Sequence, residues 1–109
     1  MNNFGGRKVI EIKKKINGNE LNISIAGRLD TMTAPQLEAE LKGVLEPNSL
    51  VVFDFEELQY LSSAGLRVLA AVQKLVNKDG SLKLIKVNEV IYEILEDVGF
   101  TDFMDIEAL

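Results

Sequence analysis

The first part of the chain alternates apolar and polar side chains at a strand-like period of two residues. Residues 8–16 and residues 21–27 both follow this pattern, which predicts two strands. The Asn17-Gly18 pair between them is a strong β-hairpin signal. The two strands are therefore expected to pair antiparallel.

The next segment changes to a helical period. Residues 27–33 break the alternation and predict a loop, and Thr33 followed by Pro35 is typical of a helix start, with Thr33 as the cap. Apolar residues then recur on one helical stripe until Pro47-Asn48, where the helix is expected to end.

The second half of the chain repeats a strand–helix order. Residues 49–55 form a nearly continuous apolar run, which predicts a buried central strand, and residues 56–61 read as a connector. From Ser63 the period becomes helical and closes at Asp79-Gly80. One apolar face is expected on that helix, formed by Gly65, Val68, Leu69, Val72, Leu75 and Val76.

A strand at residues 81–87 and a helix at 88–98 complete the pattern. Gly99 lies just past the helix end, and residues 100–109 predict a final short strand or helical turn. The face of this helix that is expected to point inward consists of Val90, Ile91, Ile94, Leu95 and Val98.

The order of elements predicts an α/β fold. We expect one domain over residues 1–109, with a core at about 8–99, built on a mixed sheet of four to five strands with helices mainly on one side. Loops at the carboxyl ends of parallel strands gather functional sites, and Ser62 and Ser63 lie at such a place.

Composition narrows the chemistry. The chain has no cysteine and no histidine, which excludes thiol catalysis, zinc–thiolate sites and a Ser–His–Asp triad and makes an enzyme or a bound metal or cofactor a poor expectation. The net charge of −5 disfavours nucleic-acid and anionic-membrane partners. Without a long apolar run or an apolar signal-peptide core, the chain is expected to be cytoplasmic.

The Ser62-Ser63-Ala64-Gly65 stretch allows several interpretations. A nucleophilic serine lacks a histidine base and the flanking glycines of G-x-S-x-G, and a phosphate-binding loop would need G-x-x-x-x-G-K-[ST]. Weak nucleotide binding at the helix start stays open. Either serine can cap the helix, and phosphorylation of Ser63 is compatible with a capping role. Ala64 and Gly65 either pack the helix on the sheet or let a partner approach closely.

Two motifs carry a resemblance to a known family. "GRLDTMTAPQL" followed by "LVVFDFEELQYLSSAGLRVL" resembles the STAS domain, and in particular the single-domain bacterial anti-sigma factor antagonists, over about residues 21–98. The resemblance implies a STAS fold and a partner-switching function. The unmodified antagonist would bind an anti-sigma factor that is also a GHKL-type serine kinase, phosphorylation would release it, and a PP2C-type phosphatase would reset it.

The same resemblance implies the site residues. The phosphorylated serine falls on Ser63, with Ser62 as second choice, and Ser62 stands where relatives often carry aspartate. The partner-binding residues that the resemblance implies are Asp30, Thr31, Ser62, Ser63, Ala64, Gly65 and Arg67.

Some alternatives remain open from the sequence. Asp30 also fits an Asx-type loop residue that bonds the nearby backbone, and Asp54 fits a turn cap or a support for the serine loop. The alternative function is a constitutive STAS-type scaffold or regulatory subunit of a transporter or signalling complex, with a weak nucleotide site.

Overall fold

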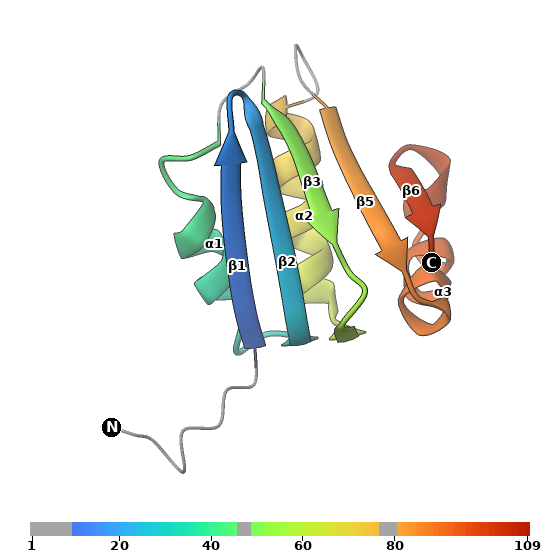
Figure 1. The fold of residues 1–109 in the computed structure, drawn as a ribbon. Helices are drawn as coiled ribbons and strands as arrows, with labels where there is room; N and C mark the ends of the chain where they lie inside the picture. The colour runs from blue at the N-terminus through green and yellow to red at the C-terminus, as the bar shows by residue number, and fades with distance from the viewer. Residues whose placement is uncertain (1–9, 46–48, 77–80) are drawn as a thin grey trace.

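A computed structural model describes residues 10–45, 49–76 and 81–109. Figure 1 shows a sheet with helices packed behind it. The elements in chain order are β1 (Ile10–Asn17), β2 (Glu20–Leu29), α1 (Ala34–Leu41), β3 (Leu50–Asp54), β4 (Leu58–Leu61), α2 (Ser63–Val76), β5 (Ser81–Val87), α3 (Glu89–Asp97), a 3-10 turn (Phe100–Asp102) and β6 (Asp105–Ala108).

The sheet is mixed and has six strands in the described part of the chain. Its order is β1-β2-β3-β5-β6, and β4 pairs with β2 beside that path. β1 and β2 form the expected antiparallel hairpin, with Asn17 opposite Glu20, and the other pairs are parallel. The α/β class and the mixed sheet are confirmed, with β4 and β6 raising the strand count above the expected four to five.

Two predicted irregular segments are partly strands. Residues 27–29 of the expected loop at 27–33 belong to β2, and residues 58–61 of the expected connector at 56–61 form β4. β2 continues to Leu29, and its last residues pair with β4 after a register shift at Gly27. A bulge of this kind interrupts the two-residue period without ending the strand. The broken pattern in the sequence therefore marks a change of partner, since β2 pairs first with β3 and then with β4.

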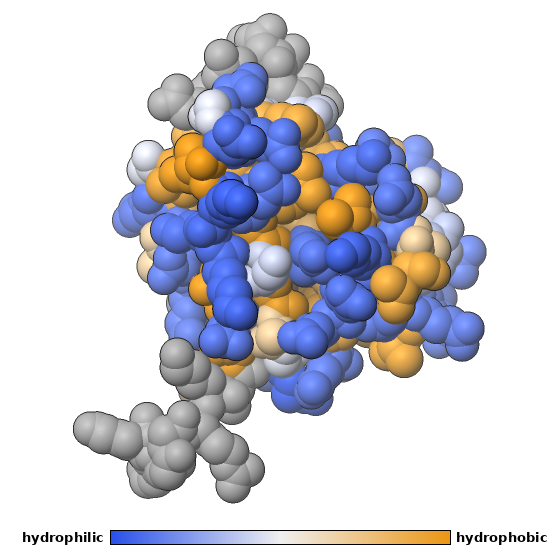
Figure 2. Space-filling model, in the orientation of Figure 1, coloured by the Kyte–Doolittle hydropathy of each residue, from blue (hydrophilic) through white to orange (hydrophobic). Residues whose placement is uncertain are grey.

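The core lies between the sheet and the helices. Alternate residues of β2 and β3 are buried on the helix side, among them Ile23 and Phe53, and Leu69 of α2 and Leu37 of α1 are fully buried against them. Polar residues cover much of the opposite sheet face, with smaller apolar areas between them (Figure 2). Because only one face of the sheet is covered, burial alternates along β3 although its sequence is nearly continuously apolar, and Val52 is only half-buried.

The helices differ from expectation at their ends and edges. α1 stops at Leu41, because Gly43 adopts a left-handed φ of 81° and turns the chain away. The expected end at Pro47-Asn48 and the Asp79-Gly80 closure both lie outside the described residues.

The inward faces are also narrower than predicted. Leu75, Val90 and Val98 are exposed and do not join the core. α3 packs mainly against β4 and the 3-10 turn, so one stripe through Ile91 and Leu95 satisfies it. The tail contains both the 3-10 turn and the short strand β6, the two forms that its sequence allowed.

Gly65 holds the first turn of α2 close to the sheet. A Cβ atom at this position would lie 2.7 Å from Leu61 Cδ1 and 2.8 Å from Leu29 Cγ. Both leucines are buried at the ends of β4 and β2, so they have little room to move. The missing side chain thus sets how closely the serine-bearing end of α2 approaches the two strands.

Replacing Gly65 by alanine tests this contact. An ordinary helix position would gain about 1 kcal/mol from the better helix propensity of alanine. Here we expect a net loss of about 1–2 kcal/mol in the free energy of unfolding, because overpacking opposes that gain. Urea unfolding of Gly65→Ala, alone and with Leu29→Ala, checks the prediction. The alanine should become less harmful once Leu29 is shortened, and a stabilised single variant would contradict the packing role.

Candidate functional site

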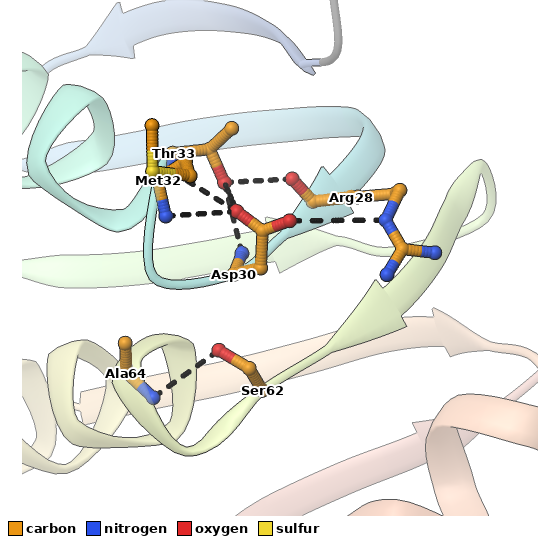
Figure 3. A network of polar contacts seen from close by, with 6 residues as sticks. All are labelled: Arg28, Asp30, Met32, Thr33, Ser62 and Ala64. Atoms are coloured by element: carbon orange, nitrogen blue, oxygen red, sulfur yellow. Dashed lines mark hydrogen bonds and ion pairs between the residues drawn. The ribbon is translucent and has the colours of Figure 1, made fainter.

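Two loops meet at the carboxyl ends of the adjacent parallel strands β2 and β4. Leu29 pairs with Leu61 in the ladder, and the Ser62 amide donates to the Leu29 carbonyl oxygen at 2.9 Å. The loop that begins at Asp30 and the start of α2 therefore lie side by side (Figure 3). Residues that are about thirty positions apart in the chain form one surface through this pairing.

Ser62 is the residue that caps α2. Its hydroxyl oxygen accepts a hydrogen bond from the Ala64 amide at 3.2 Å, and its carbonyl oxygen accepts from the Leu66 amide at 2.9 Å. Ser62 is half-buried, as a side chain folded over the helix end should be. Of the two serines that the sequence left open as the cap, Ser62 takes this role and Ser63 does not.

Ser63 is the first residue of α2 and is exposed. Within the described residues its hydroxyl makes no hydrogen bond. The two neighbouring serines therefore differ: one hydroxyl is used by the fold and the other faces solvent. The exposed hydroxyl can be modified without loss of a structural contact.

Asp30 is fixed by its own loop. One carboxylate oxygen accepts from the Met32 amide at 3.0 Å and from the Thr33 amide at 3.1 Å, and the Asp30 amide donates to the Thr33 hydroxyl at 2.9 Å. This reciprocal bonding is of the capping-box kind and closes the turn before α1. The interpretation of Asp30 as an Asx-type loop residue is confirmed.

Thr33 begins α1 as predicted, but its hydroxyl does not bond the helix amides. The hydroxyl donates to the Arg28 carbonyl oxygen at 2.7 Å and accepts from Asp30, so it ties the loop back to β2. Thr33 is buried, which fits a side chain bonded on both sides. The threonine signal was a real helix start with a different bonding pattern.

The environment of Asp30 keeps it charged. Desolvation alone would raise the pKa of its carboxyl, but the hydrogen bonds from Thr33 and Met32, with the charge of Arg28, bring the pKa below its usual value of 3.8. The Arg28 guanidinium nitrogen Nε lies 3.7 Å from the second carboxylate oxygen. The site thus includes one fixed negative charge at neutral pH.

Two exposed features of this surface were missed by sequence reasoning. The Arg28 guanidinium lies over the Tyr60 ring, 4.4 Å from its centroid, and Met32 is 80% exposed next to Asp30. Arg28 and Tyr60 face each other across β2 and β4. Only the unexpected pairing of these strands brings them together, and an exposed methionine in a loop has no pattern that marks it in advance.

A family comparison decides what this arrangement is. A model of the STAS domain matches residues 11–108. The chain belongs to the STAS domain family. The anti-sigma-B factor antagonist of Bacillus subtilis (strain 168) is 32% identical to it over 100 residues, covering 91% of this chain and 92% of that protein.

Solved structures confirm the fold of this STAS domain. An anti-sigma factor antagonist from Mycobacterium paratuberculosis superposes with a TM-score of 0.82 at 21% identity, covering 92% of this chain and 86% of that one. The phosphorylated form of SpoIIAA, a Bacillus cell fate determinant, gives a TM-score of 0.67 at 16% identity, covering 88% and 90%. At these identities the likeness speaks for the architecture.

The remaining motif residues of the STAS domain have separate positions. Thr31 and Arg67 are exposed, Ala64 is half-buried and Gly65 is buried. Gly65 therefore serves the packing of α2, and its burial gives no support to a direct partner contact. Asp54 accepts from the Glu56 amide at 3.0 Å, which confirms a turn cap.

The site shows no metal-binding cluster. Over residues 10–45, 49–76 and 81–109, no three His, Cys, Asp or Glu side chains gather where they could hold an ion. Among the same residues, no helix combines the length and apolar character that crossing a membrane requires.

The two serines can be separated by stability. Ser62→Ala should lower the free energy of unfolding by about 1 kcal/mol through loss of the cap, and Ser62→Asp should keep it, because a carboxylate also accepts from helix amides. Ser63→Ala should stay within about 0.5 kcal/mol of the parent. Urea unfolding of the three variants measures these differences. A larger loss for Ser63→Ala than for Ser62→Ala would show that the cap is assigned to the wrong serine.

Proposed function

We propose that this STAS domain is an anti-sigma factor antagonist whose binding is switched by phosphorylation of Ser63. When unmodified it binds an anti-sigma factor that is also a GHKL-type serine kinase, and when phosphorylated it is released. A PP2C-type phosphatase removes the phosphate. The domain acts in the cytoplasm as a binding module and kinase substrate, with no catalytic residue or cofactor of its own.

The observation that carries the proposal is the exposed hydroxyl of Ser63 at the first position of α2. It lies beside Ser62, the capping residue, whose hydroxyl oxygen accepts from the Ala64 amide. The similarity to the Bacillus antagonist over nine-tenths of the chain supports the same class of partner. Ser63 is preferred over Ser62 because the Ser63 hydroxyl is exposed, whereas Ser62 is half-buried and its hydroxyl is engaged by the fold.

The chemistry of the switch is a phosphoryl transfer. The Ser63 oxygen forms a bond to the γ-phosphorus of ATP held by the kinase, the bond from that phosphorus to the β–γ bridging oxygen breaks, and ADP and the hydroxyl proton leave. The product carries about −1.5 to −2 charges and three acceptor oxygens on an exposed surface. A bulky anion at this point obstructs docking and repels acidic groups of the partner.

The partner-contact surface is formed by the exposed residues around Ser63. Thr31 and Met32 come from the loop before α1, and Arg67 comes from the next turn of α2. Asp30 and Ser62 are only partly exposed and act mainly by fixing the loops that present these residues. An exposed methionine suits a contact that must form and break, because its side chain is flexible and apolar.

Charge at Ser63 should control binding without changing the fold. Ser63→Ala should bind the cognate anti-sigma factor within about threefold of the parent, whereas Ser63→Asp should bind at least about tenfold more weakly, because a charge is buried against the partner. Calorimetric titration measures both affinities, and Ser81→Asp is the matched control because Ser81 lies at the start of β5, away from the carboxyl ends of the strands.

The unfolding temperatures of the variants separate an effect on binding from an effect on the fold. All three variants should unfold at nearly the parental temperature, so that weaker binding reports contact and not unfolding. Equal affinities for Ser63→Ala and Ser63→Asp would contradict the proposed switch.

A further inference from the structure

α2 has an unusual charge pattern for this chain. The protein carries 17 aspartates and glutamates in 109 residues, yet the 14 residues of α2 include none, and Arg67 and Lys74 are its only charged side chains. Helix starts favour acidic residues, because the free amides and the helix dipole stabilise negative charge. The first turn of α2 has no such residue. The helix dipole therefore favours an anion in this turn, but the turn contains no acidic side chain.

Arg67 adds a positive charge near the first turn of α2. It lies four residues after Ser63, a spacing that puts two side chains on one face of a helix about one turn apart. Its neighbours Leu66 and Val68 are buried, while Ser63 and Arg67 are both exposed. The two side chains thus share the solvent-facing side of α2.

Arg67 also has no competing partner in the described part of the chain. It makes no ion pair there, in contrast to Arg28, which is held by Asp30 and by the Tyr60 ring. The positions three and four residues away from it are Ala64, Ala70, Ala71 and Ser63, so the helix offers it no carboxylate. A phosphate on Ser63 would be the first anion on α2 within its reach.

We propose that Arg67 is a positioning residue that captures the phosphate on Ser63. This inference rests on the proposed function, since it takes Ser63 as the modified residue. The guanidinium N–H groups of Arg67 match the spacing of two phosphate oxygens, and the positive end of the helix dipole favours negative charge in the same turn. The turn that carries Ser63 and Arg67 then changes from a net charge of +1 to about −1, which reverses the charge that a partner meets there.

The capture also keeps the modified helix stable. The phosphate supplies the negative charge that the first turn lacks, and Arg67 prevents it from turning freely into solvent. Phosphorylation would then alter the surface while strengthening the start of α2. The switch would operate through binding, with the fold of the domain maintained in both states.

The second ionisation of the phosphate tests the pairing. Phosphoserine is incorporated at position 63 during translation, so the experiment needs no kinase, and ³¹P NMR follows the titration in the full chain. A nearby cation favours the doubly charged phosphate, so Arg67→Gln should raise its second pKa by about 0.3, the size expected for an i,i+4 ion pair. Lys74→Gln is the matched control and should leave the titration unchanged, because it lies three turns away on the same helix.

A stability cycle gives a second, independent reading. Phosphorylation should raise the unfolding temperature more in the parent than in Arg67→Gln, and Arg67→Lys should keep part of that difference. Identical titrations and identical temperature gains in the parent and Arg67→Gln would overturn the inference. Failure of the anti-sigma factor to bind or modify the protein would count against the proposed function alone, because neither reading here involves that partner.

Discussion

The parallel pairing of the ends of β2 and β4 is the constraint on which the site depends. It pairs Leu29 with Leu61, so the two strands end next to each other, and the segments that follow them lead into α1 and α2. The hydrogen bond from the Ser62 amide to the Leu29 carbonyl oxygen holds the two strand ends together. Gly65 allows the first turn of α2 to pack closely against the two leucines. A wider helix–sheet separation would move the serine away from the Asp30 loop.

The adjacent residues Ser62 and Ser63 have different roles. Ser62 is bonded to the Ala64 amide and belongs to the fold, whereas the Ser63 hydroxyl is free among the described residues. An aspartate at position 62 could take the same capping role, because serine and aspartate side chains both accept from a helix amide. Ser62 itself carries no charge beside Ser63, and Asp30, held by Met32 and Thr33, is the fixed anion of the surface.

The sequence predicted elements with strong local signals well. The Asn17-Gly18 hairpin, the strand at Ser81–Val87 and the helix that ends just before Gly99 could be predicted because each depends on neighbouring residues alone. The motif around Ser63 was likewise located correctly at a helix start. What local reading could not supply was β4, because a four-residue strand is visible only through its partner.

The finer assignments in the site failed for the same reason. Thr33 bonds Arg28 and Asp30 because the loop folds back, and Arg28 reaches the Tyr60 ring because a bulge at Gly27 redirects β2. Which of two adjacent serines caps a helix depends on where the preceding strand stops. The pairing of β4 with β2 determines the residue at which β4 ends, and no local sequence pattern indicates that residue.

Mapping the phosphorylated residue tests the account most directly. The unmodified protein is incubated with its cognate anti-sigma factor kinase and ATP, and the modified peptide is sequenced by mass spectrometry. The account predicts one phosphate, carried by Ser63, with the Ser62→Asp variant modified at the same position. Phosphate on Ser62, or a kinase that modifies a known relative but leaves both serines unmodified, would contradict it.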